Sequence, residues 1–456
     1  MKSPAGGIPA PAGVGDVLRL AWPSVLSFVC NSAYRVNDQY WVQGLGPAAH
    51  SALGATTFVL VLNFAVFFVG AAGSLSLVAR ATGSGRVRER EAVVRHALAL
   101  AAVVGVGLAV VGAWLAPSLP HWLGLTGEPA SLAAEYLGTI YVYCLPLALA
   151  PVVDTIFIGM GNTRVPLLLQ GTAVALNFVL NPCLIYGLGP FEARGIEGAA
   201  LATCLSRAVS AGMGLVLLRT AFDVRWARES TLSARRLLDI LRVGVPSALS
   251  IAIYAGVYLV MMRLVISPLG ADVVGGLAIG FNAFEGVSFP FYLGVAVAGS
   301  SIVGRNLGAG DPAAAWQAVR TIRRIGHVLG LAFLAVFLLF GPALVPLFTD
   351  DVGIDREALL YLRILALSQV FVAAEAMNEK VLLGAGHTLP IFCISVPGNV
   401  LRVPLSWLFA TVLGHGAAGV WWAINVTTLL KAAALWWMVE RRTWQAAPAA
   451  SAPRAS

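Results

Sequence analysis

The sequence predicts an all-α integral membrane protein whose twelve membrane-spanning helices form two six-helix lobes. Three observations lead to this fold class. The 456-residue chain is 58% hydrophobic and only 11% charged, with a mean hydropathy of +0.82. Its apolar residues gather in twelve segments long enough to cross a bilayer. Motifs of the first half also recur in the second half, so the two halves are expected to share one fold.

Twelve apolar segments are the predicted spans, because about 20 residues cross the hydrocarbon core as a helix. Pro23, Pro146, Pro151 and Pro290 can bend the spans in which they lie. The segments are near residues 16–42, 51–79, 93–115, 131–158, 166–187, 197–219, 244–267, 272–304, 322–346, 357–383, 391–413 and 417–439.

Composition excludes several classes of function. The stretches between spans are too short for a soluble domain, and no G-x-x-x-x-G-K-[ST] loop binds a nucleotide, so an ATPase is excluded. The basic residues behind the net charge of +8 are distributed among the loops and do not form one patch, so no nucleic-acid partner is expected. The five cysteines lie within apolar spans without metal-ligand spacing, so neither disulfides nor a metal site are expected. No cofactor is predicted; the lipid bilayer and a small molecule are the expected partners.

Loop charge sets the predicted orientation. Arginines cluster in the loops near 80–95, 219–242 and 305–324, whereas the alternate loops are nearly bare, with Arg194 and Arg356. Positively charged loops stay on the cytoplasmic side of a membrane. The sequence therefore predicts a multi-pass protein of the bacterial inner membrane with both termini in the cytoplasm.

An internal repeat of about 225 residues divides the chain. Gly159-x-Gly161-x-Thr163 recurs as Gly384-x-Gly386-x-Thr388, Arg80-x-x-Gly83-x-Gly85 recurs as Arg305-x-x-Gly308-x-Gly310, and Asp154 falls on Glu379. Each half has six spans, so the halves share one orientation and are expected to be related by a pseudo-twofold axis along the membrane normal. The predicted parts are a cytoplasmic tail (1–14), an N-lobe (15–219), a cytoplasmic linker (220–242), a C-lobe (243–440) and a second cytoplasmic tail (441–456).

Span 1 carries a stripe of polar residues. Asn31, Tyr34, Arg35 and Asp38 are spaced by one to four residues, which places them along one side of a helix. Charge at membrane depth costs about 2.5–3.5 kcal/mol on insertion scales, so such a stripe faces a cavity or another helix. We interpret Asp38 as an ion-coupling residue and Asn31 and Tyr34 as cavity residues. The alternative is a structural Arg35–Asp38 ion pair.

Spans 5 and 8 add further polar groups. Asn177 and Asn181 lie one helical turn apart and can line the same cavity as Asp38; interhelical packing is the alternative. Asn282, Glu285 and Tyr292 share one face of span 8. Glu285 has no cation one turn away, so we interpret it as an ion-coupling acid.

The acids of span 10 are expected to carry the largest free-energy cost of membrane insertion in the sequence. Glu375 and Glu379 lie one turn apart on one face. With Glu285 they can form a cluster of carboxylates in which at least one must hold a proton, and an arriving cation would expel that proton. The alternative for Glu379 is a simple pair with Lys380.

Four cations also lie within spans, and we interpret them as charge balance for the acids: Arg207, Arg263, Arg402 and Lys431. Aromatic side chains can wall a site for organic cations through their ring faces, although ordinary helix packing is the alternative for each. The candidates are Tyr34, Phe64, Phe67, Phe281, Phe284 and Tyr292.

Several motifs together resemble those of the bacterial multidrug and toxic compound extrusion (MATE) transporters, over about residues 15–440. The motifs are Val36-Asn37-Asp38-Gln39 through Gly44-Leu45-Gly46, Gly159-Met160-Gly161-Asn162-Thr163-Arg164, Asn177–Pro182, Ser301-Ile302-Val303-Gly304-Arg305-Asn306-Leu307-Gly308-Ala309-Gly310 and Gly384-Ala385-Gly386-His387-Thr388.

The resemblance implies twelve helices in two lobes that form a V, and antiport in which organic cations leave as protons or sodium ions enter. It implies that Asp38 matches the N-lobe carboxylate implicated in ion coupling, and Asn177 its amide neighbour. Asn181 stands where many prokaryotic members have Asp, which removes one titratable group. The acids in spans 8 and 10 fit another prokaryotic branch.

The predicted function is therefore a monomeric, ion-coupled exporter of amphipathic organic cations that works by alternating access, with no catalytic residues. A lipid-linked saccharide flippase of the same superfamily is the nearer alternative. A membrane-embedded enzyme is a more distant one, because the sequence has no H-E-x-x-H or Gly-x-Ser-x-Gly motif.

Overall fold

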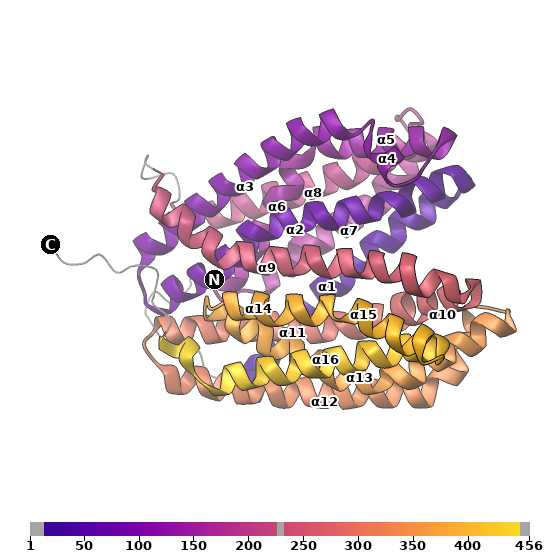
Figure 1. Ribbon diagram of the computed structural model, residues 1–456. Helices are drawn as coiled ribbons and strands as arrows, with labels where there is room; N and C mark the ends of the chain where they lie inside the picture. Colours follow the sequence, from indigo (N-terminus) through magenta and orange to yellow (C-terminus); the bar gives the residue numbers. More distant parts are fainter. Residues whose placement is uncertain (1–12, 226–231, 447–456) are drawn as a thin grey trace. The chain divides into compact units, whose positions relative to one another are not determined.

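The computed structural model of the chain describes residues 13–225 and 232–446 (Figure 1). Every regular element in these two stretches is a helix. Ten of these helices or continuous helical stretches are long and apolar enough to cross a membrane, and the bent pair Gly127–Val142 and Cys144–Gly159 makes eleven. The remaining predicted span corresponds to α1 (Val14–Gln43), a 30-residue helix that is more polar than these. The predicted all-α membrane fold is confirmed.

The helices divide into two compact units. The N unit comprises Leu26–Ala248, and the C unit comprises the described residues 13–25 and 249–446. Two helices, α1 and α9 (Ala234–Met261), contribute one part to each unit. The other helices of the N unit are α2 (Pro47–Gly83), α3 (Val87–Leu115), α4 (Leu119–Trp122), α5 (Gly127–Val142), α6 (Cys144–Gly159), α7 (Arg164–Tyr186) and α8 (Gly195–Thr220).

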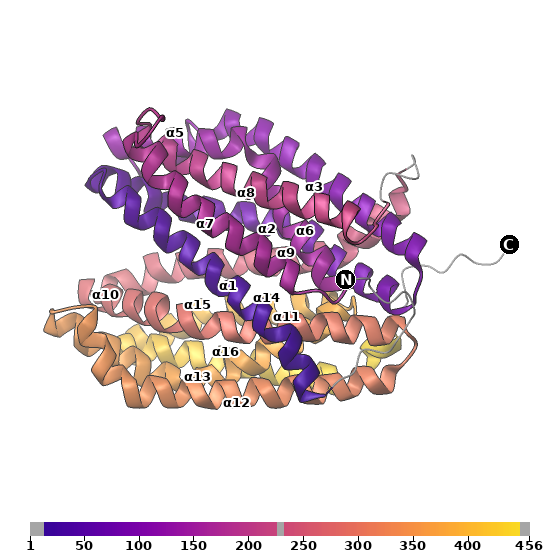
Figure 2. The ribbon, with the colours of Figure 1, turned by 180° about the vertical axis from the view of Figure 1, so that it is seen from behind.

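Several helices of the C unit are joined to short 3-10 and π turns, which are labelled η. Its elements after α9 are η1 (Met262–Ile266), η2 (Ser267–Leu269), α10 (Ala271–Ile279), η3 (Gly280–Glu285), α11 (Gly286–Gly308), α12 (Pro312–Leu344), η4 (Val345–Leu347), α13 (Val352–Gly384), α14 (Leu389–Val400), α15 (Arg402–Trp407), η5 (Leu408–Val412), α16 (Gly416–Glu440) and η6 (Thr443–Ala446). Within the N unit α2, α3 and α6 lie side by side, and within the C unit α13 lies beside α12 and α16 (Figures 1 and 2).

The fourth predicted span is broken at Tyr143. Helices α5 and α6 meet there at an angle of 59°. Pro146 lies in the first turn of α6, where a backbone N–H has no partner within the helix, so its absence does not destabilise α6. Because proline has no N–H to donate, the hydrogen-bond pattern of α5 cannot continue through it. The bend that the sequence allows at Pro146 is therefore present.

The repeat is visible in the turns between helices. The turn from α6 to α7 and the turn from α13 to α14 have the same backbone hydrogen bonds: Gly161 N–H donates to Ile158 at 2.8 Å, and Gly386 N–H donates to Leu383 at 2.9 Å. Gly161 and Gly386 have φ angles of +81° and +70°, which glycine adopts without steric cost. The repeated Gly-x-Gly-x-Thr motif thus specifies one repeated helix-turn-helix connection.

The divided helices α1 and α9 dock through glycines. A side chain at Gly244 on α9 would place its Cβ 1.9 Å from the carbonyl oxygen of Val69 on α2, within the N unit. A side chain at Gly294 on α11 would come within 2.5 Å of Val25 on α1, within the C unit. Close backbone approach through glycine is a common way for helices to pack in membranes.

Each unit has its own packed interior. Leu137 and Ile140 on α5 are buried against Ile196 of α8 in the N unit. In the C unit Tyr361 on α13 and Trp421 on α16 meet edge to face, with ring centroids 4.8 Å apart. Lipid tails are as apolar as these side chains, so close packing rather than removal from water holds such helices together.

The predicted linker, 220–242, is described in part. Residues 226–231 lie outside the described residues, and 234–242 form the first turns of α9. On the N unit, Ser233 N–H donates to His96 Nε2 at 2.8 Å and Arg225 N–H donates to Glu91 at 2.8 Å. The hydrogen bond and charge of Arg225 lower the pKa of Asp223 in the same turn. Most of the predicted tails, 1–12 and 447–456, also lies outside the described residues, so the domain boundaries stay a prediction.

Candidate functional site

A buried carboxylate marks the first candidate site, in the N unit. Asp38 on α1 accepts hydrogen bonds from Asn177 Nδ2 (3.0 Å) and Asn181 Nδ2 (2.8 Å) of α7. Its second oxygen accepts from the hydroxyl of Thr203 on α8 at 3.1 Å. The structure thus brings together the three residues that the sequence assigns to ion coupling in this half, and it adds Thr203. Their role in coupling stays a prediction.

The two asparagines are fully buried. Because one helical turn separates them, both lie on the same face of α7. Asn177 Oδ1 accepts hydrogen bonds from Asn37 Nδ2 at 2.7 Å and from Asn181 Nδ2 at 3.2 Å. Asn181 Oδ1 differs, because this buried acceptor has no hydrogen-bond donor among the described residues. A buried acceptor without a donor is uncommon in native structures.

Arg207 on α8 is a cation near this site, and neutral groups hold it. Its guanidinium donates to Gln170 Oε1 at 2.7 Å and to Asn31 Oδ1 at 2.9 Å. It also lies over the ring of Tyr34, 4.6 Å from the centroid. Gln170 Nε2 in turn donates to Asp154 at 2.6 Å. Asn31 and Tyr34, predicted to line a cavity, therefore position Arg207.

The cation–π contact of Arg207 with Tyr34 and two further hydrogen bonds join these groups to Asp38. The hydroxyl of Tyr34 donates to the backbone oxygen of Thr203 at 3.0 Å, and the side chain of Thr203 contacts Asp38. We call the chain from Asp154 through Gln170 and Arg207 to Asp38 the N-unit polar network. Sequence reasoning missed Thr203 and Gln170, because single polar residues in apolar spans are common and carry no signal of their own.

The polar groups of the C unit are arranged differently. Lys431 on α16 donates to Glu375 Oε1 at 2.7 Å and to Asn399 Oδ1 at 2.9 Å. Arg402, at the start of α15, donates to the hydroxyls of Thr427 (3.1 Å) and Thr428 (3.0 Å) on α16. Lys431 and Arg402 are each only 3% exposed. The interpretation of Lys431 as charge balance fits this geometry.

The three C-lobe acids do not share one site. Glu379 pairs with its neighbour Lys380 at 2.5 Å, which is the alternative that the sequence left open. Glu285, at the end of η3, has Tyr361 of α13 as its side-chain hydrogen-bond partner. In the described stretches no three Asp, Glu, His or Cys side chains group closely enough to hold a metal ion. The acids therefore have separate partners instead of forming a carboxylate cluster.

The remaining predicted cavity residues fall into two groups. Three are buried in the packed interior of their units: Phe67, Phe284 and Tyr292. The other three are exposed: Phe64, Phe281 and Asn282. Tyr292 donates to Gln369 at 3.1 Å, so its hydroxyl already has a partner. The side chain of Arg35 lies outside the described part of the chain, so the predicted Arg35–Asp38 pair stays a prediction.

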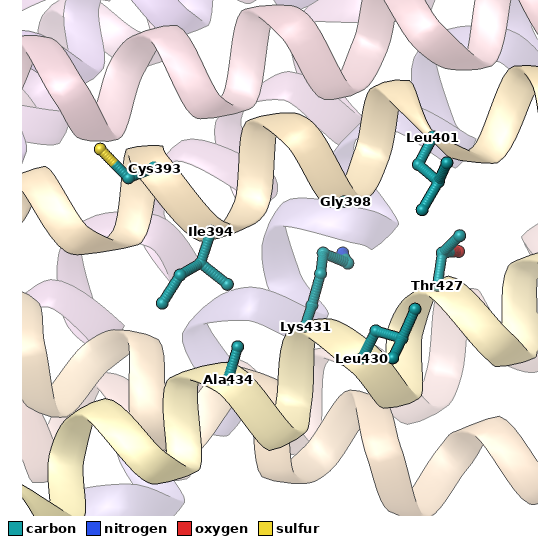
Figure 3. Close-up of a pocket in the computed structure, with 8 residues that line it drawn as sticks. All are labelled: Cys393, Ile394, Gly398, Leu401, Thr427, Leu430, Lys431 and Ala434. Atoms are coloured by element: carbon teal, nitrogen blue, oxygen red, sulfur yellow. The ribbon is translucent and has the colours of Figure 1, made fainter.

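A pocket of about 270 Å³ lies between α14 and α16 in the C unit (Figure 3). Ile394, Gly398 and Leu401 form one side, and Thr427 and Lys431 form the other. Figure 3 shows Lys431 reaching from α16 toward Gly398, where the missing side chain leaves room for it. The wall is apolar except for Thr427 and Lys431.

Comparisons with known proteins agree with this architecture. The family model described as MatE matches residues 23–183 and 246–408, one match in each half of the chain. A probable multidrug resistance protein NorM from Thermotoga maritima is 28% identical over 421 residues, which cover 89% of this chain and 88% of the relative. An FAD transporter from Shewanella oneidensis is 26% identical over 466 residues, covering 97% of each chain.

Solved structures show the same fold. A crystal structure of MATE in complex with MaL6 matches with a TM-score of 0.89 and 25% identity, covering 97% of this chain and 99% of that chain. An outward-facing multidrug resistance MATE family transporter of the MOP superfamily matches with a TM-score of 0.87 and 25% identity over the same shares. This multi-pass membrane protein is therefore a transporter of small molecules and not an enzyme. The two matches to the family model span most of the sequence, and the chain belongs to the MatE family of multidrug efflux transporters.

Proposed function

We propose that this protein exports organic compounds across the bacterial inner membrane in exchange for protons or sodium ions, and that Asp38 carries the coupling ion. The proposal includes alternating access, amphipathic cations as substrates, a monomeric state, both termini in the cytoplasm, and no cofactor other than the coupling ion. Names among the relatives support drug export, and the polar groups of the N unit support the coupling site.

The observation that carries the proposal is the set of groups around Asp38. Its carboxylate accepts three hydrogen bonds from neutral donors, and no described cation lies within 4.0 Å of it. The amide of Asn181, which donates to Asp38 through its nitrogen, also has a buried oxygen without a donor among the described residues. A proton would neutralise the carboxylate of Asp38, and a sodium ion would take its oxygens as ligands. The site therefore suits reversible binding of a small cation.

Exchange follows from the low dielectric of a membrane protein. Burial penalises the ionised carboxylate, and the three hydrogen bonds stabilise it, so both forms of Asp38 can be populated. An organic cation bound near Asp38 would favour the ionised carboxylate and so expel the proton or sodium ion. By thermodynamic linkage, an arriving ion then lowers the affinity for the organic cation by the same factor.

The substrate class rests on fewer observations. Asp38 and Glu285 have no ion pair with a described residue and can attract an organic cation, whereas Glu375 and Glu379 are already paired. The name FAD transporter of one relative adds a dinucleotide to the compounds that should be tried. No observation here favours the flippase alternative.

Reconstitution in proteoliposomes tests the proposal. Ethidium transport is measured with a proton gradient and a sodium gradient imposed separately, and empty liposomes give the background. We expect transport to follow one of the two gradients and to collapse when an ionophore dissipates it. Transport that depends on neither gradient would exclude ion-coupled exchange.

A further inference from the structure

Arg402 is a buried cation without a charged partner. Its guanidinium hydrogen-bonds the hydroxyls of Thr427 and Thr428, and it lies 5.8 Å and 5.7 Å from the ring centroids of Tyr254 and Tyr258 on α9. Within the described stretches, no carboxylate oxygen comes within 4.0 Å of it. Taking a charge out of water costs several kcal/mol unless another charge compensates it, so an unpaired guanidinium at 3% exposure calls for an explanation.

The acids of the C unit do not supply that charge at close range. Glu285 and Glu375 act on Arg402 only across a longer distance. Each has a closer partner of its own, Tyr361 for Glu285 and Lys431 for Glu375. Arg402, Lys431 and Glu375 together carry one net positive charge when all are ionised, and Glu285, whose close partner Tyr361 is neutral, balances it only from a longer distance.

Lys431 lines the pocket between α14 and α16, and one of its N–H donors has no acceptor among the described residues. An ammonium group has three N–H donors. Two of them bond Glu375 and Asn399, at 2.7 Å and 2.9 Å, and the third has no acceptor among the described residues. The pocket wall also contains Thr427, which is the acceptor for Arg402 Nε. The pocket wall thus includes Lys431 and the hydroxyl residue that binds Arg402, and its remaining wall is apolar.

We propose that this pocket binds the anionic group, a carboxylate or phosphate, of a small amphiphilic organic molecule. Lys431 donates its third N–H to the anion, Arg402 balances the charge, and the apolar body lies along Ile394 and Leu401. The volume of about 270 Å³ suits a small compound, because drug-sized ligands occupy pockets of about 300–1,000 Å³. The inference goes beyond the proposed function, since anion binding here requires neither ion coupling nor export.

A pair of ligands with one aromatic body and opposite charges tests the site. Tritiated 2-naphthoate and 2-naphthylmethylammonium are measured by equilibrium dialysis against the full chain in a neutral detergent. Arg402→Gln removes the charge but keeps hydrogen-bonding groups for Thr427 and Thr428. Arg320→Gln is the matched control, because Arg320 is an exposed arginine of the same unit. Monodispersity and thermal unfolding show whether each variant is folded.

We expect the wild-type protein to bind naphthoate about tenfold more tightly than the ammonium compound, since a charged hydrogen bond is worth about that much. Arg402→Gln should lose about tenfold in naphthoate affinity, with the ammonium compound unaffected, and Arg320→Gln should bind as wild type. Equal binding of the two ligands by the wild-type protein overturns the proposal even if Arg402→Gln does not fold. Undiminished naphthoate binding by folded Arg402→Gln overturns it as well.

The anion can come from a soluble compound or from a lipid headgroup, and a second arm separates these sources. Naphthoate binding is repeated in nanodiscs of phosphatidylcholine with and without phosphatidylglycerol. Competition by phosphatidylglycerol in the wild type, absent in Arg402→Gln, identifies an anionic lipid as the ligand. Naphthoate binding that phosphatidylglycerol leaves unchanged identifies a soluble organic anion.

Discussion

The two units hold their buried acids in different ways. In the N unit an acid, Asp38, is surrounded by neutral donors, and Arg207 is held by neutral acceptors and an aromatic ring. In the C unit the acids Glu375 and Glu379 pair with lysines, whereas Glu285 is held by Tyr361 and Arg402 by hydroxyls. By the repeat of about 225 residues, Arg402 stands where the N unit has Asn177. The same position of the repeat thus carries a neutral amide in one half and a buried cation in the other.

The difference teaches that a buried acid is not by itself a coupling site. A carboxylate that is already paired with a cation, such as Glu375, gains little from taking up a proton, because protonation breaks the ion pair. A carboxylate held by neutral donors, such as Asp38, can exchange its charge state without leaving another charge unpaired. We therefore propose that ion coupling takes place in the N unit, at Asp38.

Substitution of Asp38 should have the largest effect. Asp38→Asn removes the exchangeable charge and turns one acceptor into a donor that faces Asn177 and Asn181. Ethidium transport driven by the coupling gradient in proteoliposomes should fall by about tenfold or more. Asp350→Asn, at an exposed loop position, should transport as wild type. Wild-type rates from folded Asp38→Asn would make this acid structural and remove the contrast between the units.

Breaking the C-unit ion pair should affect stability more than coupling. Lys431→Met leaves the carboxylate of Glu375 buried without its cation, which costs about 3–5 kcal/mol of unfolding free energy. The double variant Glu375→Gln/Lys431→Met should recover much of that loss. Thermal unfolding in detergent measures the cycle. Arg194→Met breaks the exposed Arg194–Glu197 pair and should cost about 1 kcal/mol or less. A double variant as unstable as the worse single one would contradict the pairing.

Removing the bridge of the N-unit polar network should have a smaller effect. Gln170→Ala deletes the hydrogen bonds to Asp154 and Arg207 and leaves both charged groups without that partner. We expect a loss of about 1–3 kcal/mol in unfolding free energy, measured in the same way. Gln317→Ala on the exposed face of α12 is the control. Equal melting temperatures for the two variants would show that Gln170 contributes nothing to the network.

The repeated turns should respond equally in the two halves. Gly161→Ala and Gly386→Ala each force a side chain into a positive φ angle, at a cost of about 1 kcal/mol. Gly171→Ala in α7 has open space around it and should instead stabilise the helix slightly. Clearly unequal losses of unfolding free energy at Gly161 and Gly386 would show that the two turns are not structurally equivalent.

The sequence predicted the fold well because bilayer physics leaves few options. Length, hydropathy and the repeat indicated the spans, and Pro146 indicated where one of them bends. The spacing of polar residues along single helices showed which of them share a face, and the family resemblance made Asn177 the amide neighbour of Asp38. Contacts between helices could not be predicted from the sequence, because nothing in the spacing shows that Lys431 contacts Glu375 or that Arg207 contacts Gln170. The expected cluster of C-lobe acids illustrates this limit, because residues on one helix face can still have separate partners.

The most direct test asks which acid releases an ion when an organic cation binds. Ethidium is added to the protein in weakly buffered detergent solution, and released protons are followed with a pH indicator and displaced sodium with ²²Na. The account predicts that the wild type and Glu375→Gln release the same amount of one of these ions and that Asp38→Asn releases neither. Wild-type release from Asp38→Asn, together with its loss in Glu375→Gln, would contradict the assignment of coupling to the N unit.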